Sequence, residues 1–188
     1  MGDQQVRNKG TIGGNIAHAD PASDLPAAVM ALGGTITVTG ASGERQISAD
    51  EFFVDLLMTN LDEKELLTGI EVNTVGDGAG SAYLKFEHPA SGFAIVGAAA
   101  VVAVDGNGVC TSASICLNGA TATPLNASAV AAALVGKSLD DAAIDDAVNS
   151  NLKVNDPMSD IHASGEYRTE LAKVYARRAL KLARDRAS

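Results

Sequence analysis

The chain has no tryptophan, and aromatic residues make up only 4% of its 188 residues. A core without large rings must be filled by smaller side chains, and 46% of the residues are hydrophobic. A chain of this length buries roughly 70% of the surface that its unfolded form exposes. We therefore expect one domain or two small ones, with alanine and valine filling most of the core.

Cysteine is scarce: Cys110 and Cys116 are too few for a metal cluster or a zinc site. Their even spacing would place both side chains on one face of a strand, too far apart along it to form a disulfide easily. We expect two buried free thiols. The histidines, His18, His88 and His162, are scattered without metal-ligand spacing, so we expect them to be surface or hydrogen-bonded residues and predict no metal site.

Basic residues are few: 14 lysines and arginines against 23 aspartates and glutamates give a net charge of −9. A nucleic-acid partner is therefore not expected, because it would need a basic stripe. Residues 173–186 are basic and residues 140–146 are acidic. These could be two solvated faces, with cations favoured at a helix C-terminus, or a docking site. No signal peptide or membrane-length apolar run is evident, which predicts a cytoplasmic protein.

The most informative stretch is residues 11–26, TIGGNIAHADPASDLP. Adjacent glycines, Gly13 and Gly14, would permit positive φ and let a ligand approach the backbone closely. Successive exposed N–H groups then form a concavity that suits a phosphate or pyrophosphate. A Gly-Gly pair is also common in ordinary turns. The stretch alone therefore leaves both a dinucleotide loop and a tight turn open.

Residues 6–15 (VRNKGTIGGN) and 19–26 (ADPASDLP) closely resemble the second flavin-binding segment of a known family, the FAD-binding medium subunit of molybdenum hydroxylases of the carbon monoxide dehydrogenase and xanthine dehydrogenase type. The similarity continues through residues 65–70, 82–86 and 93–97 to the C-terminal helix, and so covers nearly the whole chain. It implies an oxidoreductase subunit that holds FAD and passes electrons from iron–sulfur clusters to an external acceptor. It also implies two partners, an iron–sulfur small subunit and a molybdopterin large subunit.

The resemblance implies a set of FAD-contacting positions in this sequence: Thr11, Ile12, Gly13, Gly14, Asn15, Asp24, Leu66, Lys85 and Phe93. Of these, Thr11, Gly13, Gly14 and Asn15 would contact the pyrophosphate. Asp24 would accept hydrogen bonds from the ribose or adenine, or else cap the following helix. Asp20 would instead fix the turn before Pro21.

Three further positions have competing interpretations. Leu66 would contact the flavin or pack in the core, and Lys85 would place a cation near the phosphates or flavin or be a solvated strand residue. Phe93 would lie beside the isoalloxazine, although residues 88–92 depart from the more charged loop of the family. No nucleophile–base pair or substrate acid–base set is present. The redox chemistry would therefore belong to the cofactor.

In the first half of the chain, Ser23 or Asp24 would cap a helix that ends at residue 32 before a Gly-Gly pair. Residues 35–39, 44–47 and 66–72 are predicted strands, and residues 48–51 have the form of a capping box. Residues 1–10 are polar and show no periodic pattern. A glycine-rich break at residues 76–80 is the candidate domain boundary.

The second half predicts an antiparallel sheet followed by helices. Strands are expected at residues 82–87, 95–104 and 109–117, the last two joined by a DGNG hairpin. The predicted helices cover residues 127–135, 139–152 after a Ser138 cap, and 165–184. The fold class is thus α+β: a partial FAD-binding (PCMH-type) subdomain at residues 1–76, then a CO dehydrogenase flavoprotein C-terminal domain at residues 80–188, with a three-stranded antiparallel sheet and a three-helix bundle.

In the family, the segment that resembles residues 6–26 follows a subdomain with a first glycine-rich flavin loop, for which this sequence shows no match. We therefore expect a truncated or naturally short version that binds FAD weakly or not at all, because the remaining contacts must offset the whole entropic cost of fixing the ligand. Exposed edges and apolar surface would favour a homo-oligomer. The alternatives are a non-catalytic folded fragment or assembly module, and an independent FAD-dependent reductase of the cell-wall precursor type.

Overall fold

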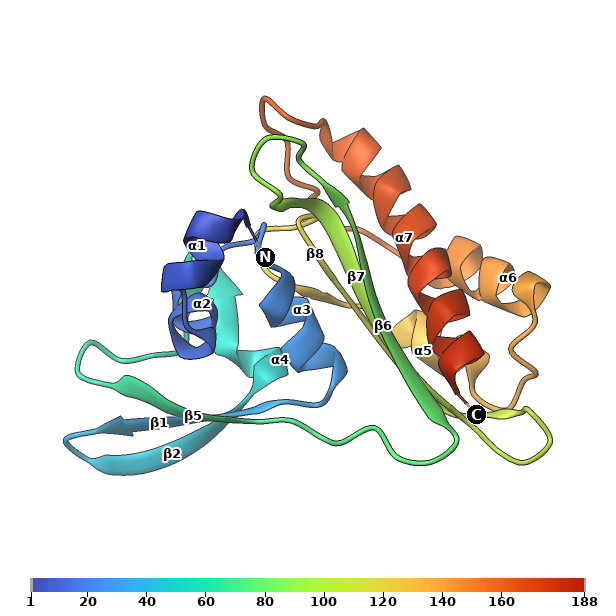
Figure 1. Cartoon of the computed structure of the whole chain (residues 1–188), viewed down its shortest axis with the longest axis horizontal. Helices are drawn as coiled ribbons and strands as arrows, with labels where there is room; N and C mark the ends of the chain where they lie inside the picture. The colour runs from blue at the N-terminus through green and yellow to red at the C-terminus, as the bar shows by residue number, and fades with distance from the viewer. Residues whose placement is uncertain (1, 188) are drawn as a thin grey trace.

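Two antiparallel sheets organise the chain (Figure 1), whose computed structural model describes residues 2–187. The smaller sheet has the strand order β2-β1-β5 and the larger the order β6-β7-β8-β9, while β3 and β4 form a separate pair. The strands are β1 (Thr35–Gly40), β2 (Gly43–Ser48), β3 (Phe53–Asp55), β4 (Met58–Thr59), β5 (Leu66–Glu71), β6 (Ala79–Glu87), β7 (Ala94–Val104), β8 (Cys110–Asn118) and β9 (Leu125–Asn126). The helices of the described residues are α1 (Gln4–Lys9), α2 (Ile12–His18), α3 (Asp24–Ala31), α4 (Ala49–Phe52), α5 (Ser128–Leu134), α6 (Asp141–Asn151) and α7 (Gly165–Arg186).

The larger sheet is covered on both faces: α3 packs on β7 and β8 from one side, and α5 and α7 pack on the sheet from the other. Strand β7 is consequently buried over nearly its whole length, which explains its continuous apolar sequence in place of a polar–apolar alternation. The sequence run 94–104 predicted this buried strand, and the structure confirms it.

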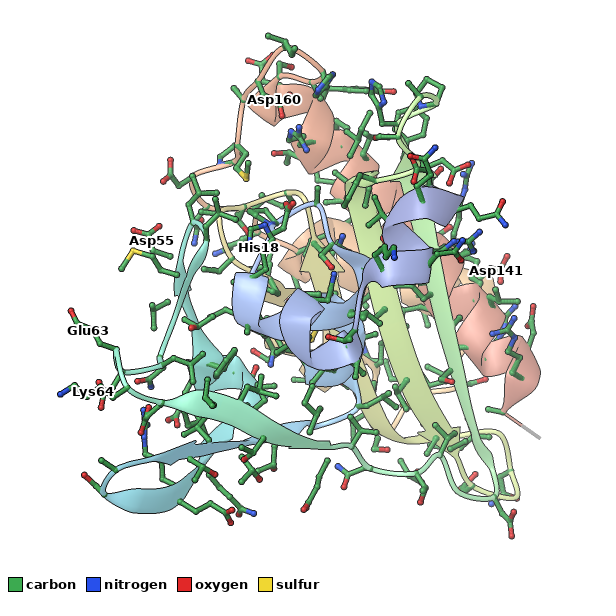
Figure 2. The ribbon with its side chains drawn as sticks, turned by 60° about the vertical axis from the view of Figure 1, so that its left-hand side comes forward. His18, Asp55, Glu63, Lys64, Asp141 and Asp160 are labelled. Atoms are coloured by element: carbon green, nitrogen blue, oxygen red, sulfur yellow. The ribbon has the colours of Figure 1, made fainter. Side chains whose placement is uncertain are left out.

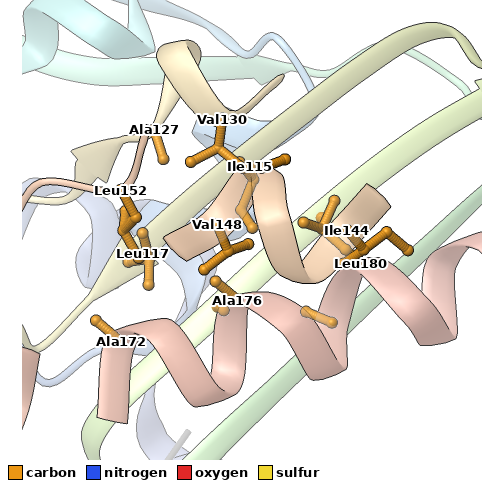
Figure 3. Packing of buried hydrophobic residues seen from close by; sticks show 14 of the residues in the cluster. Ile115, Leu117, Ala127, Val130, Ile144, Val148, Leu152, Ala172, Ala176 and Leu180 are labelled. Atoms are coloured by element: carbon orange, nitrogen blue, oxygen red, sulfur yellow. The ribbon is translucent and has the colours of Figure 1, made fainter. Parts of the chain in front are cut away.

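Small side chains fill the core, as the composition predicts. On α7 the alanines Ala172, Ala176, Ala179 and Ala183 form a buried stripe within the core cluster. Figure 3 shows Ala172, Ala176 and Leu180 of this helix in the cluster. Alanine has no side-chain bulk beyond Cβ, so the helix can lie close to the strands. A second cluster lies between α3 and the smaller sheet and includes Phe52, which is fully buried.

Both cysteines are buried and free, as predicted, but they face opposite sides of the large sheet. Cys110 belongs to the cluster beneath α5–α7, and Cys116 to the cluster on the α3 side. The pairing register of β7 and β8 shifts between Ala103 and Val104. One extra residue reverses the alternation of side chains, so the prediction of a shared face is wrong. Burial raises the pKa of the Cys116 thiol to about 12.

The predicted strands of both halves are confirmed to within a few residues, and β9 adds a short fourth strand to the larger sheet. Three local predictions need correction. Helix α6 is capped by Asp140, whose Oδ1 accepts the N–H of Ala143 at 2.8 Å, and not by Ser138. The capping box precedes only the four-residue α4, where Ser48 accepts the Asp50 N–H at 3.3 Å. Residues 4–9, which show no periodic pattern, form α1.

The acidic and basic segments of the second half neutralise each other across α6 and α7. Lys181 Nζ lies 3.2 Å from Asp141 and 3.0 Å from Asp145, and Arg184 lies 2.6 Å from Asp141. The hydrogen bond from Arg184 lowers the pKa of Asp141. The two charge clusters therefore form one interhelical network, which the separate interpretations of the two segments missed. Within residues 2–187, no helix has the length and apolarity needed to cross a membrane.

A close approach of β6 to the end of α7 depends on Gly80. A Cβ at this position would lie 2.5 Å from the backbone nitrogen of Ala187 and 2.7 Å from the carbonyl carbon of Arg186. We expect Gly80→Ala to lower the free energy of unfolding by about 1–3 kcal/mol, because α7 must move away from the sheet. Urea denaturation followed by circular dichroism measures this. Gly76→Ala, whose Cβ meets no atom within 4 Å, is the control; equal stability of the two variants would contradict the prediction.

Candidate functional site

The diglycine segment starts a helix and is not the left-handed loop that the sequence predicted. Thr11 is the N-cap of α2, and its Oγ1 accepts the N–H of Gly14 at 3.0 Å. Neither Gly13 nor Gly14 has a positive φ. The amides of Ile12 and Gly13 lie in the first helical turn, where no intrahelical acceptor exists for them. The predicted concavity of exposed loop amides is therefore absent from this segment, which forms a helix N-terminus.

A cavity of about 520 Å³ lies beside this helix, between α1, α2 and the loop that precedes β7. Four of the predicted FAD-contacting residues line it: Thr11, Ile12, Asn15 and Phe93. Its size falls within the range of small-molecule sites. The structure therefore gathers side chains from two segments about 80 residues apart in the sequence around one hollow.

The two glycines differ in what the fold requires of them. A Cβ on Gly14 would lie 3.0 Å from Thr11 Oγ1, the atom that caps the helix, so packing explains this glycine. A Cβ on Gly13 would lie 3.6 Å from Leu67 Cδ2, an ordinary contact. Since alanine is roughly 0.5–1 kcal/mol better than glycine inside a helix, folding gives no reason for glycine at position 13.

Asp24 and Lys85, two of the predicted FAD-contacting residues, form an ion pair with each other. Lys85 Nζ lies 3.0 Å from Asp24 Oδ2, and only 16% and 12% of the two side chains are exposed. The same ammonium donates to the carbonyl of Gly92 at 2.6 Å, and the Tyr83 hydroxyl donates to Asp24 Oδ1 at 2.8 Å. Burial raises the pKa of Tyr83. Lys85 is therefore not a solvated strand residue, and the N-cap of α3 is Ser23, not Asp24.

Leu66 lies outside both the cavity wall and the core. Its side chain is 73% exposed at the start of β5, so the core-packing interpretation is wrong. Its neighbour Leu67 contacts the position of Gly13 on α2 instead. Contact between Leu66 and the flavin stays a prediction.

A second cavity of about 400 Å³ adjoins the first and shares His18, Asp20 and Phe93 with it. His88 and His162, which are far apart in the sequence, also line it, with ring centroids 4.6 Å apart. Among residues 2–187, no group of three or more histidine, cysteine or carboxylate side chains could hold a metal ion. The Asp20 carboxylate accepts the Ala22 N–H at 2.9 Å, and so fixes the turn before α3 as predicted.

Sequence reasoning missed Arg168, a buried residue of α7 that lines the second cavity. Its guanidinium donates to the carbonyls of Ile95 and Gly119 and to Asp160 at 2.6 Å. It joins the start of α7 to the ends of β7 and β8. A single arginine among the basic residues of α7 gives no signal in the sequence that distinguishes it.

The fold and site define a two-part α+β protein with a ligand-sized cavity at a capped diglycine helix. Residues 81–183 match the family model described as CO dehydrogenase flavoprotein C-terminal domain, and residues 1–73 match the FAD binding domain in molybdopterin dehydrogenase. The chain belongs to the CO dehydrogenase flavoprotein family. The resemblance and the fold class predicted from the sequence are both confirmed.

Known proteins similar to this chain include medium subunits of several dehydrogenases. It is 38% identical to the carbon monoxide dehydrogenase medium chain of Afipia carboxidovorans, over 100% of this chain and 65% of that one. It is 36% identical to the glyceraldehyde dehydrogenase medium chain of Sulfolobus acidocaldarius, over 96% and 64%. The solved carbon monoxide dehydrogenase from Hydrogenophaga pseudoflava matches with a TM-score of 0.94 at 35% identity, covering 100% of this chain and 65% of that chain. The chain thus spans about 65% of the length of these relatives.

The Asp24–Lys85 pair should dominate stability at the site. Lys85→Met removes the ammonium group that lies 3.0 Å from the Asp24 carboxylate, and we expect it to lower the free energy of unfolding by about 3 kcal/mol. Adding Asp24→Asn should cost less than the sum of the two single substitutions, because the variants share one interaction. Chemical denaturation of the wild type, both single variants and the double variant measures the coupling. Strict additivity would show that the pair is not an energetic unit.

Asp160 should make stability depend on pH at the acid end. Partial burial raises its pKa, but the N–H groups of His162 and Ala163 and the Arg168 guanidinium together hold the pKa below its ordinary value of 3.8. The stabilisation is therefore present above pH 3.8 and is lost as the pH falls through the folded-state pKa. We expect the stability difference between wild type and Asp160→Asn to shrink with acidification. A difference that stays constant in acid would contradict this.

Proposed function

We propose that this chain carries FAD as part of the medium subunit of a molybdenum hydroxylase complex. It would receive electrons from an iron–sulfur small subunit and pass them to an external acceptor, while a molybdopterin large subunit oxidises the substrate. The observation that carries the proposal is the match of both segments to the family models, together with a glycine at position 13 that folding does not require.

The residues at the start of α2 fit the pyrophosphate of FAD. The amides of Ile12 and Gly13 are donors without intrahelical partners, and the positive end of the helix dipole favours an anion. The absence of a Cβ at Gly13 would let phosphate oxygens reach the backbone. Thr11 holds the first turn through its cap, so these donors are fixed before a ligand arrives.

Other residues would hold and shield the cofactor. Lys85 fixes the carbonyl of Gly92 and thereby the position of Phe93, which lies at the wall shared by the two cavities. The apolar ring would exclude water from that boundary, and exposed Leu66 and Ile12 offer apolar contact. Bound FAD would supply the chemistry itself, since a flavin exchanges electrons singly and in pairs.

For this 188-residue polypeptide by itself, we propose weak FAD binding. Ile12, at the cavity wall, is more than half exposed, and the contacts on this chain alone must offset the full cost of fixing a large ligand. The exposed apolar surface around Leu66 would then favour self-association. The alternative function is a non-catalytic fragment or assembly module. Such a chain would bind no flavin and would therefore be colourless.

The test is a FAD titration of Gly13→Ala, followed by quenching of flavin fluorescence. We expect the variant to be at least as stable as the wild type, because alanine suits the helix, while its Kd for FAD rises about tenfold or more, equivalent to roughly 1.4 kcal/mol.

Gly106→Ala is the matched control, because its Cβ meets no atom within 4 Å in a turn outside the cavity lining. If Gly13→Ala and the wild type bind FAD with equal affinity, the start of α2 does not contact the pyrophosphate. Absence of FAD from the assembled complex would defeat the proposed function. A stoichiometrically yellow isolated chain would contradict weak binding and the assembly-module alternative.

A further inference from the structure

The hairpin formed by β3 and β4 ends in an exposed apolar tip, which we define as residues 54–58. Val54, Leu56, Leu57 and Met58 are each between 50% and 55% exposed. Single exposed apolar residues are normal on protein surfaces, but four among five consecutive positions form a patch of the kind that marks interaction sites. The fifth residue of the tip is Asp55.

Leu57 occupies a backbone conformation that disfavours its own side chain. Its φ is 56°, in the left-handed region, where a residue with a Cβ costs roughly 1–2 kcal/mol relative to the usual region. Glycine or asparagine commonly fills such turn positions. Since the leucine side chain is half exposed, the core does not compensate for the strain. Strain of this kind persists where function uses it.

Among residues 2–187, Ala19 and Asp156 are the other left-handed residues that are not glycine, and both differ from Leu57. Ala19 is buried and ends α2, so a structural role accounts for it. Asp156 is of a residue type that tolerates this region. Leu57 alone among the three combines a strained backbone with a large apolar side chain in solvent.

The tip stands in an acidic surround. Residues 50–65 contain six carboxylates and one lysine. Glu51, Asp55 and Glu63 are exposed and form no salt bridge with another residue of the described part of the chain. Figure 2 shows Asp55 and Glu63 on the same side of the molecule, with their side chains directed away from the ribbon.

This charge decides what kind of partner fits. A second copy would bring carboxylates against carboxylates, and nucleic acid or an anionic membrane would be repelled. A protein with an apolar pocket rimmed by lysine or arginine would complement both the apolar tip and its acidic surround.

The tip also adjoins the candidate site. Leu56 and Leu57 line the 400 Å³ cavity together with His18 and Phe93, both of which also line the 520 Å³ cavity. We propose that residues 54–58 dock into a basic-rimmed apolar pocket on another subunit of the complex, next to the flavin site. The inference rests on the proposed function only for the identity of the complex, because docking itself needs no flavin.

The first test measures stability and association together for Leu57→Gly. Purified iron–sulfur and molybdopterin subunits serve as probes against the immobilised chain. We expect the variant to unfold at the same or a higher urea concentration, because glycine relieves the left-handed strain, while its affinity for one probe falls at least tenfold. Val135→Ala, at another exposed apolar residue, is the control and should change neither quantity.

Leu57→Asn, which also suits the left-handed region, repeats the test if the glycine loosens the turn. Undiminished affinity for both probes in either folded variant would overturn the proposal. An FAD titration of the wild type separates the two proposals, because a chain that docks without binding flavin would defeat the proposed function and leave the docking surface standing.

The second test examines the charge and the contact directly. The affinity of the wild type should fall as salt rises, and Glu63→Lys should weaken it further and flatten the salt dependence. A photo-cross-linker, p-benzoylphenylalanine, introduced in place of Met58 in the assembled complex should label a lysine- or arginine-containing segment of another subunit. Cross-links confined to this chain, or salt-independent binding, would overturn the proposal.

Discussion

The ion pair between Asp24 and Lys85 holds the two parts of the candidate site together. Asp24 begins α3, the next helix after α2, and Lys85 belongs to β6 of the larger sheet. From Asp24 the contacts run outward in both directions. Lys85 fixes the carbonyl of Gly92 beside Phe93, and Ser23, the residue before Asp24, donates to Asn15 Oδ1 on α2 at 2.6 Å. Because both side chains are largely removed from water, separating them would cost more than separating an exposed ion pair.

The double-sided larger sheet provides the platform for this pair. Strand β7 is covered by α3 on one face and by α7 on the other, so a shift of α3 would disturb residues such as Ala99 that face it. Close packing of small side chains leaves little freedom for such a shift. The helix that carries Asp24 is therefore positioned by the apolar core, and the polar network is positioned by the helix.

Local patterns in the sequence predicted most of the strands and helices, because burial on one or both faces sets their periodicity. The features that escaped depend on contacts distant in sequence or on a change of register. One extra residue in β8 reversed the face of Cys110, and nothing in the sequence marks that bulge. The convergence of His88 and His162 joins a hairpin loop to the segment before α7. The diglycine was expected to be a loop because adjacent glycines permit positive φ, but both glycines lie in the first turn of α2, which Thr11 caps.

Two residues stand out because folding would favour the opposite choice at each. At position 13 the backbone is helical and has room for a Cβ, yet the sequence places a glycine there. At position 57 the backbone is left-handed and suits glycine, yet the sequence places a leucine with its side chain half in solvent. Sequences that fold well agree with their local structure, and departures are expected where function imposes its own requirement. In the functions proposed above, the first departure would open the backbone to a ligand and the second would present an apolar side chain to a partner. Leu57 lines the 400 Å³ cavity, and Gly13 follows two residues that line the adjoining 520 Å³ cavity. The two residues that the fold does not explain therefore lie near the same pair of cavities.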